Sequence, residues 1–343
     1  GVQDMCNLLV RRGKSFQIEA GHWEKSDVLD RVVRRLDSAR MAHHMTSLKA
    51  GLAGEPFKGM GDFHVSPADL KATIGIETRI LTPKIFKALV SEVTEEDIQA
   101  ERKRDEQRFQ FSDINEDAYR ISARTGLALQ RWIDREGIGA FSFNFLHVGE
   151  ATGLETAPFL QASKFMAQGV GFGGEGDLLT ASLVSSLSSV NPETSFSEMF
   201  CPDWKNDRVY LMHMGEMNWQ LTDGKPSLLE MEWQWSDAVN PLYVAGRFKA
   251  GKFVLVDLLP LEPLQKGAYR LIVTPAEMLP VSGKDNFGKN VHGWFKPAMP
   301  VADFLAAYSR AGGTHHLAIS YGLGVDAVVA FGEMMGWETV VIR

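Results

Sequence analysis

The spacing of apolar residues predicts a helix at the start of the chain. Apolar side chains recur between Val2 and Val10 at intervals of three and four residues, which places them on one helical face, and Gly13 is positioned to end the helix. The next residues alternate between apolar and polar, with Phe16 and Ile18 on one side, and this pattern favours a short strand.

A second helix is predicted after this strand. Ser26 is a suitable N-cap, and Gly51 is placed to close the unit. The apolar residues of this helix are Val28, Leu29, Val32, Val33 and Leu36. A lone helix and strand cannot bury their own apolar faces, and the chain opens with Gly rather than Met. Residues 1–54 are therefore expected to be the remainder of an N-terminal α/β domain.

The pattern of residues 55–193 predicts a central α/β domain with helices layered on a sheet. Residues 91–137 are dense in charges of both signs, which is typical of solvated helix faces, and residues 115–136 continue as an amphipathic helix. Phe141, Phe143 and Phe145 then alternate with polar residues, as in a strand. Helices are expected over 157–167 and, after a glycine-rich turn, over 178–187.

Residues 194–343 have a different pattern of apolar and turn-forming residues, which predicts a mainly antiparallel β-domain. Short apolar segments are separated by Gly, Pro, Asn and Asp, as in a barrel or a sandwich. A helix over 302–310 and a last strand over 339–342 complete this part. The expected fold is thus α/β plus β: a partial N-terminal α/β unit, a central α/β layered domain and a C-terminal antiparallel domain resembling a β-barrel.

Composition narrows the class of protein. Of 343 residues, 45% are hydrophobic and 23% are charged, as in globular proteins, and the net charge of −7 disfavours nucleic acid or an anionic membrane as a partner. Two cysteines, Cys6 and Cys201, exclude a disulfide scaffold. The longest charge-free stretch, 178–192, is short and rich in serine, and no signal peptide is recognised. We expect no membrane span and a cytoplasmic location.

The turn Gly169–Asp177 is the first candidate for chemistry. A glycine-rich turn before a helix can cradle phosphate, because the helix N-terminus offers free N–H groups. Glu175 and Asp177 stand where the anion would bind, and the turn contains no Lys or Arg, so a cation is favoured over phosphate. Spacing alone leaves open a purely structural role, in which the glycines form a tight turn and the acids cap the helix.

Three further positions carry polar groups in unusual contexts. Glu198 follows the short alternating segment Thr194–Ser197, and alone it would be an ordinary surface acid. His213 lies between methionines on a predicted strand, where a hydrogen-bonded core histidine is the more common case. The pair His315-His316 follows Gly312-Gly313, which permits close approach of the backbone. Two carboxylates and two imidazoles would suit Mn²⁺, Co²⁺ or a similar divalent ion, provided that they meet in the fold.

In order and spacing these motifs resemble the L-arabinose isomerase family. The resemblance rests on Gly171-Phe-Gly-Gly-Glu-Gly-Asp177, Thr194-Ser-Phe-Ser-Glu198, His213-Met-Gly-Glu216 and Gly312-Gly-Thr-His-His316. Gly21-His22-Trp23 and Gly61-Asp62 extend it over nearly the whole chain. The family has a further N-terminal α/β domain, most of which this chain lacks.

The resemblance implies a set of site residues. The implied metal ligands are Glu175, Glu198, His213 and His316, with His315 beside them as a substrate-binding residue and manganese as the usual ion. Phe145 would supply an aromatic wall to the sugar pocket. The family also implies a homo-oligomer whose active site lies near subunit contacts. Two segments depart from the family pattern, Met214–Trp219 and Ala318–Tyr321, and both could line the sugar pocket.

The implied reaction is aldose–ketose isomerisation of a free, unphosphorylated pentose or related sugar. A proton moves between C1 and C2, so a carboxylate must remove it and return it, while a divalent ion stabilises the enediolate. Glu175 and Glu198 are the expected acid/base pair. Two alternatives remain open: a nucleotide-dependent oxidoreductase or transferase that uses the glycine-rich turn, and a non-catalytic sugar-binding relative.

Overall fold

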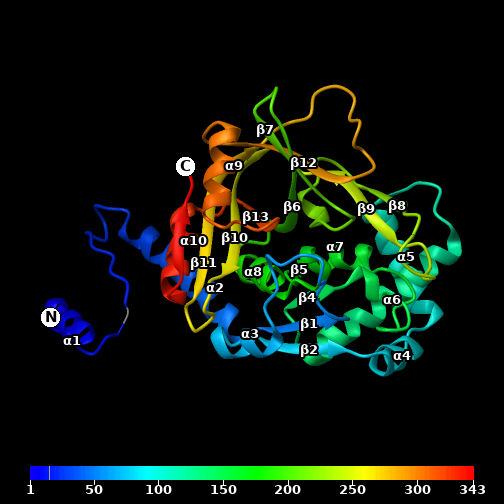
Figure 1. The fold of residues 1–343 in the computed structure, drawn as a ribbon, viewed down its shortest axis with the longest axis horizontal. Coiled ribbons are helices and arrows are strands. Elements are labelled where there is room, and N and C mark those ends of the chain that lie inside the picture. Colours follow the sequence, from blue (N-terminus) through cyan, green and yellow to red (C-terminus); the bar gives the residue numbers. More distant parts are fainter. Residues whose placement is uncertain (15) are drawn as a thin grey trace.

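A computed structural model describes residues 1–14 and 16–343. It contains a parallel-sheet α/β region and, packed against it, a closed antiparallel barrel (Figure 1). The predicted combination of α/β and β architecture is confirmed. Helix α1 stands apart from the rest of the chain at the N-terminal end, and none of its residues is buried.

The chain alternates helices and strands up to residue 188 and is then mainly β. The α-helices are α1 (Val2–Arg11), α2 (Val28–Ser47), α3 (Pro67–Thr73), α4 (Pro83–Ser91), α5 (Glu95–Arg108), α6 (Glu116–Glu136), α7 (Phe159–Ala167), α8 (Leu178–Ser188), α9 (Val301–Arg310) and α10 (Val325–Met335). Three short 3₁₀ helices are η1 (Phe145–His147), η2 (Gly174–Gly176) and η3 (Trp219–Leu221). The strands of the first half are β1 (Lys49–Ala53), β2 (Glu77–Leu81), β3 (Gln110–Phe111), β4 (Ala140–Phe143) and β5 (Gly171–Gly173).

The α/β region is built on a four-stranded parallel sheet in the order β2-β1-β4-β5. Ala50 of β1 lies opposite Thr78 on one side and Ala140 on the other. Helix α8 contacts β4 and β5 of this sheet and also the barrel strands β6, β10 and β13. Every residue of α8 is buried, because the helix is enclosed between the two halves of the molecule.

The barrel consists of six strands in the order β11-β10-β13-β6-β7-β12, closed by pairing of β11 with β12. Strand β14 extends it parallel to β11, and β9, β8 and β3 extend it beyond β12. The strands of this half are β6 (Thr194–Asp203), β7 (Arg208–His213), β8 (Ser227–Glu230), β9 (Leu242–Arg247), β10 (Gly251–Pro260), β11 (Tyr269–Met278), β12 (Val291–Pro297), β13 (His316–Tyr321) and β14 (Glu338–Val341). Closure leaves the central strands without a free edge.

Capping explains where the long helices begin and end. The Asn115 side chain accepts hydrogen bonds from two backbone N–H groups at the start of α6, and Gly137 ends that helix in the left-handed conformation. Thr94 and Asp97 form a reciprocal capping box at the start of α5. Asp177 caps α8 through the backbone N–H of Thr180 at 2.9 Å.

Most elements predicted from periodicity are confirmed, with local corrections. The predicted strand around Phe16 and Ile18 is wrong, because residues 16–20 form no strand. Asp27 rather than Ser26 is the N-cap of α2, although the Ser26 hydroxyl accepts the Val28 N–H at 3.4 Å. Gly51 does not close the helical unit, since it lies within β1.

The remaining differences concern boundaries. The third phenylalanine of the predicted strand, Phe145, begins η1 instead, because the strand ends at Phe143. The domain division at residues 54 and 193 stays a prediction. Strand β1, which ends at Ala53, belongs to the same sheet as β4.

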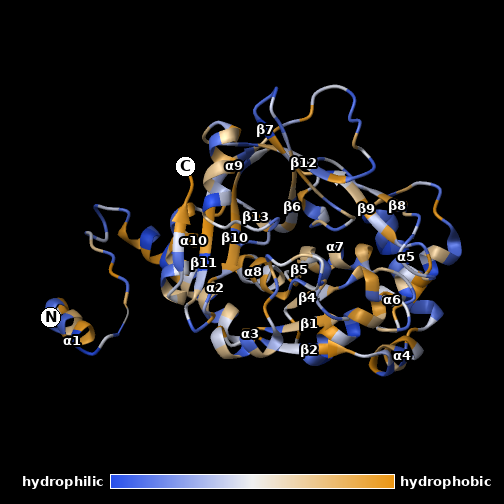
Figure 2. Ribbon diagram, in the orientation of Figure 1, coloured by the Kyte–Doolittle hydropathy of each residue, from blue (hydrophilic) through white to orange (hydrophobic). Residues whose placement is uncertain are grey.

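The apolar residues in the second half of α2 join it to the C-terminal helix α10. Met41 and Met45 of α2 are fully buried, and α2 packs on both α10 and α8. Its first turns instead present Leu29, Val32 and Val33 to solvent, and α1 likewise carries both hydrophobic and hydrophilic residues in Figure 2. No helix in the described part of the chain combines the length and the apolar character needed to cross a bilayer.

Candidate metal and sugar site

The predicted site residues lie where the parallel sheet meets the barrel. Glu175 follows β5, at the carboxyl end of the parallel sheet, which is where open α/β sheets place ligands. Glu198 lies in β6 and pairs in register with His316 at the start of β13. His213 is the last residue of β7, next to the residue that faces Glu198. Segments up to 141 residues apart, from Glu175 to His316, thus converge.

The backbone of Glu175 is in an unusual conformation. Its φ of 60° and ψ of 19° fall in the left-handed region, which is costly for a residue other than Gly, Asn or Asp. Such a conformation costs about 1–3 kcal/mol and persists when the surroundings fix it. Here the Glu175 carbonyl accepts the Phe57 N–H at 2.8 Å, which fixes the turn from the neighbouring loop.

Three potential ligand atoms meet at the centre of this cluster. One side-chain atom each of Glu175, His315 and His316 lies within 4.8 Å of the other two. Among the residues that the structure describes, the buried atoms Glu175 Oε2 and His316 Nε2 have no hydrogen-bond partner. A buried carboxylate oxygen and a buried ring nitrogen without hydrogen-bond partners are costly, because burial also removes the water that would otherwise bond to them. A cation placed between them would satisfy both.

Each histidine of the cluster is held by a carboxylate through Nδ1. The distances are 2.6 Å from His315 to Asp62, 3.0 Å from His316 to Asp177, and 2.6 Å from His213 to Glu216. A carboxylate acceptor keeps a proton on Nδ1, so Nε2 is the ring nitrogen that these three carboxylates do not occupy. This is the usual arrangement around histidines that bind metals.

Aromatic packing sets the positions of the rings. The Phe196 ring packs edge-on against both His213 and His316, with centroid distances of 4.7 Å and 5.0 Å. Phe63 stacks on His316 from another side at 5.0 Å. Gly174 is required at its position, because a Cβ there would lie 2.8 Å from Cε1 and Nε2 of His213. The imidazoles are therefore held by packing as well as by hydrogen bonds.

The charged groups of the cluster shift the pKa values of Glu175 and His315. Burial favours the neutral form of Glu175, but His315, His316 and His213 outweigh it and lower the pKa of this carboxyl. Burial likewise opposes ionisation of His315, yet Asp62 and Glu175 raise its pKa to about 10. His315 Nε2 lies 3.9 Å from Glu175 Oε2, which is an ion-pair distance rather than a hydrogen bond.

Sequence reasoning identified the members of this cluster but not all of their partners. The central group in the structure is Glu175, His315 and His316, whereas Glu198 and His213 border it. The His213 and His316 ring centroids are 5.6 Å apart. The orienting roles of Asp62, Asp177 and Glu216 were not predicted. Those of Asp177 and Glu216 could have been suspected, because each lies two or three residues from a predicted ligand.

Phe145 belongs to an aromatic wall beside the cluster. Its ring contacts Phe57 at a centroid distance of 5.4 Å and Trp235 at 5.7 Å. Trp235 in turn contacts Trp233 at 4.8 Å. The backbone bond between Phe57 and Glu175 links this wall to the cluster.

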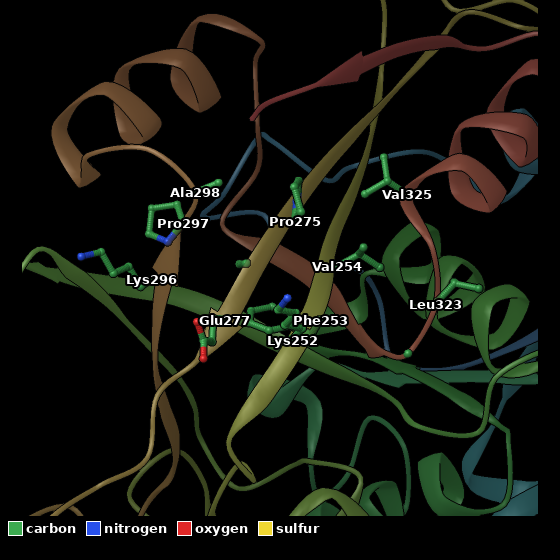
Figure 3. A pocket seen from close by; sticks show the side chains of 12 residues that line it. Lys252, Phe253, Val254, Pro275, Glu277, Lys296, Pro297, Ala298, Leu323 and Val325 are labelled. Atoms are coloured by element: carbon green, nitrogen blue, oxygen red, sulfur yellow. The ribbon is translucent and has the colours of Figure 1, made fainter.

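A separate groove lies on the barrel. It has a volume of about 500 Å³ and runs along Phe253 and Val254 of β10 and Pro275 of β11, and the charged residues Lys252, Glu277 and Lys296 also line it (Figure 3). Within the described chain it shares no lining residue with the cluster of Glu175, His315 and His316. The groove is mostly apolar and does not offer the carboxylate and imidazole groups of the candidate site.

The protein combines a parallel α/β layer with a six-stranded barrel, and carboxylate and imidazole groups gather where the two meet. Two sequence profiles of known families match this chain. The L-arabinose isomerase central domain matches residues 68–192, and the L-arabinose isomerase C-terminal domain matches residues 193–338. The chain belongs to the L-arabinose isomerase family.

Individual relatives agree with this assignment. An L-arabinose isomerase of Oceanobacillus iheyensis is 25% identical over 97% of this chain and 71% of its own length. An L-arabinose isomerase of Shewanella sp. strain ANA-3 is 26% identical over 100% of this chain and 69% of its own length. L-arabinose isomerase 2 of Bacillus licheniformis is 24% identical, with 97% and 71% covered.

Proposed function

We propose that this protein is a metal-dependent aldose–ketose isomerase that acts on a free pentose or a related sugar. The observation that carries the proposal is the pair of unpaired buried atoms, Glu175 Oε2 and His316 Nε2, within a group of three potential ligands. Family membership supports the reaction class, because the relatives are L-arabinose isomerases.

The residues of the cluster fit a divalent cation. Asp177 holds the proton of His316 on Nδ1, so Nε2 points a lone pair at the Glu175 carboxylate. Mixed nitrogen and oxygen donors suit Mn²⁺, Co²⁺ or a similar ion, and we propose Mn²⁺. Glu175 and His316, together with Glu198 and His213 at the border, are the proposed ligands. Bound there, the ion would supply the Lewis acidity that stabilises negative charge developing on neighbouring sugar oxygens.

Proton transfer is the part of the reaction that the protein side chains perform. Isomerisation removes a proton from one of two adjacent carbons and returns it to the other, with the carbonyl moving in the opposite direction. Glu175 and Glu198 are the proposed acid/base pair. Burial raises the pKa of Glu175, but the neighbouring charged His315 lowers it, so Glu175 stays ionised and is able to accept a proton.

The charge of the cluster favours a neutral sugar as substrate. Glu175, Glu198 and Asp62 place carboxylates around the site, and a phosphorylated sugar would bring a further anion close to them. Phe145 and its aromatic neighbours offer an apolar surface against which the C–H face of a sugar could pack. We propose His315 and Phe145 as substrate-binding residues.

The nucleotide alternative is disfavoured at the glycine-rich turn. The Asp177 carboxylate already occupies the N-terminus of α8, where it accepts the Thr180 N–H. A phosphate there would have to displace this buried carboxylate and approach Glu175. The family match also gives no support to a nucleotide-dependent enzyme.

Metal removal and reconstitution test the proposed function. Protein treated with a chelator should lose conversion of L-arabinose and related aldoses to ketoses, and Mn²⁺ should restore it, with product measured by chromatography. Metal content measured by mass spectrometry should fall and recover in parallel. Activity that survives complete metal removal would refute the metal role. Metal binding without conversion of any aldose or ketose would favour the non-catalytic alternative.

We further propose that the protein is a cytoplasmic homo-oligomer with no nucleic-acid or membrane partner. The net charge of −7 supports the last point, because a negatively charged surface repels phosphate backbones and anionic lipids. Light scattering of the purified protein tests the oligomeric state.

A further inference from the structure

The loop between β1 and α3 reaches from the parallel sheet to the barrel. Its Phe57 N–H donates to the carbonyl of Glu175 at 2.8 Å. Further along, Phe63 is buried and stacks on His316. Between these two anchors, Asp62 faces His315. The loop therefore contacts several members of the proposed site at once.

A single oxygen of Asp62 makes two hydrogen bonds to the same residue. Asp62 Oδ2 accepts from His315 Nδ1 at 2.6 Å and from the His315 backbone N–H at 3.1 Å. One bond fixes the orientation of the ring and the other fixes the backbone that carries it. With Nδ1 engaged as a donor, Nε2 is the atom that points towards Glu175, 3.9 Å away.

Asp62 differs from the carboxylates that hold the other two histidines. Asp177 and Glu216 are almost completely buried; Glu216 is local to His213, whereas Asp177 is separated from His316 by 139 residues. The Asp62 side chain is 37% exposed, and its segment is separated from His315 by 253 residues. The position of His315 therefore depends on a contact between two parts of the chain that are distant in sequence.

We propose that Asp62 is a positioning residue, which holds His315 with a proton on Nδ1 and thereby presents Nε2 to Glu175 and to the ligand bound beside it. The proposal rests on the proposed isomerase function for its effect on turnover. Its structural part, the state of the His315 ring, is independent of any activity.

The two hydrogen bonds to one oxygen make an informative set of variants possible. In Asp62→Asn, the amide oxygen can replace Oδ2 and accept both bonds, so the position of His315 is retained while the charge is lost. In Asp62→Ala, both bonds are lost. Glu55→Gln is a matched control, because it removes a carboxylate from the same loop whose partner is the exposed Lys58.

Nuclear magnetic resonance of the metal-free protein labelled with ¹⁵N-histidine measures the ring state directly. The His315 signals are assigned among the 9 histidines by comparison with His315→Asn. We expect the Nδ1 proton of His315 to be retained in Asp62→Asn and Glu55→Gln and to be lost or exchange-averaged in Asp62→Ala. Unchanged His315 signals in Asp62→Ala would overturn the proposal, whatever the protein catalyses.

Turnover and Mn²⁺ affinity provide the functional measurement. Removal of a residue that orients a metal-binding or substrate-binding group typically costs about 10–100-fold in activity or affinity. We expect a loss of this size in Asp62→Ala, substantial recovery in Asp62→Asn and no loss in Glu55→Gln. Equal losses in Asp62→Ala and Glu55→Gln would contradict the proposal, since they would indicate a general effect of the loop. A parent protein with no isomerase activity would refute the proposed function but leave the resonance result intact.

Discussion

Two buried ionic clusters in this molecule are organised in opposite ways. In the first, Lys164 is 3% exposed and its Nζ lies 2.7 Å from Glu101 and 2.6 Å from Asp105. Arg104 also contacts Glu101, and Arg108 lies 3.5 Å from Asp105. Every carboxylate of this cluster has a cation beside it, so its charges are balanced by the chain itself.

The second cluster, around Glu175, is not balanced in this way. Within the described chain its ion pairs are all with histidines, through Asp62, Asp177, Glu175 and Glu216. Glu175 Oε2 and His316 Nε2 have no hydrogen-bond partner among the described residues. Asp105 Oδ1 of the first cluster has none either, but an arginine lies 3.5 Å from it, whereas the ionic neighbour of Glu175 Oε2 is a histidine at 3.9 Å. The comparison suits a structural role for the cluster that lysine and arginine neutralise, and it supports the proposal that the cluster with only histidines as partners binds a cation.

The largest expected effect is on catalysis at the unbalanced cluster. Glu175→Gln and Glu198→Gln each remove a proposed proton-transfer group without a change of volume. We expect each to reduce kcat by about 10²–10⁴-fold, the usual contribution of positioned acid/base catalysis. Steady-state kinetics measures the loss, and circular dichroism verifies that the fold is retained. Near-normal turnover in either variant would remove that glutamate from the mechanism.

The next effect is on stability at the balanced cluster. Lys164→Met leaves Glu101 and Asp105 buried without their shared cation, and breaking a buried ion pair typically costs about 3–5 kcal/mol. Chemical denaturation should report a loss of this size in the free energy of unfolding. The turnover of the folded fraction should not change, because this cluster has no part in the proposed site.

Two further variants control for Lys164→Met. Adding Glu101→Gln and Asp105→Asn to it should recover much of the lost stability, since neutral side chains no longer need a cation. Arg124→Ala breaks a half-exposed pair with Glu155 and should cost about 0–1 kcal/mol. A cost below 1 kcal/mol for Lys164→Met itself would mean that the buried cluster contributes no more than a surface pair.

Asp257 is an intermediate case, because its partners are neutral. It is fully buried and accepts from the Tyr308 hydroxyl and the Thr314 backbone at 3.0 and 2.9 Å. Burial raises the pKa of Asp257 to about 7, despite these hydrogen bonds. In the unfolded chain the pKa of Asp is about 3.9. Between these two values the folded state binds a proton that the unfolded state has lost, so stability falls as the pH rises from 4 to 7.

Asp257→Asn should remove this part of the pH dependence. The amide can accept the same bonds from Tyr308 and Thr314 through its oxygen, and it cannot ionise. Above pH 7 we expect the variant to be more stable than the parent by about 2–4 kcal/mol, and below pH 4 the difference should vanish. Denaturation at several pH values, compared as a difference between the two proteins, checks this. A constant difference at every pH would show that ionisation of Asp257 is not its cause.

Periodicity predicted the elements of this fold better than their ends. Helices such as α6 and α8 follow from apolar spacing and from caps such as Asn115 and Asp177, which act locally. The strand expected at Phe16 failed because its apolar residues have no sheet to pair with: Phe16 and Ile18 are exposed. Pairing across the sequence, as between Ala50 and Ala140, is not encoded in any local pattern.

For the site, the sequence provided the residues but not the geometry. Glu175 and the histidine pair could be selected because their glycine contexts were unusual, and family resemblance linked them. The two hydrogen bonds between Asp62 and His315 could not be predicted, since they join residues 253 positions apart. Neither could the left-handed backbone of Glu175, because a Glu in that conformation contradicts local preference.

That left-handed backbone gives the smallest and most diagnostic prediction. Glu175→Gly should stabilise the protein by about 1 kcal/mol, since Gly adopts a φ of 60° without strain, and should raise Tm by about 2–4 °C. Glu175→Gln keeps the strain and should not show this gain. Asp113→Gly is the matched control at a φ of 46°, where Asp is already well tolerated, so its gain should be smaller.

If Glu175→Gly were both more stable and inactive, the unbalanced cluster would be a place where stability is given up for function. A destabilised Glu175→Gly would instead mean that Glu175 contributes to the fold in the way that Lys164 does.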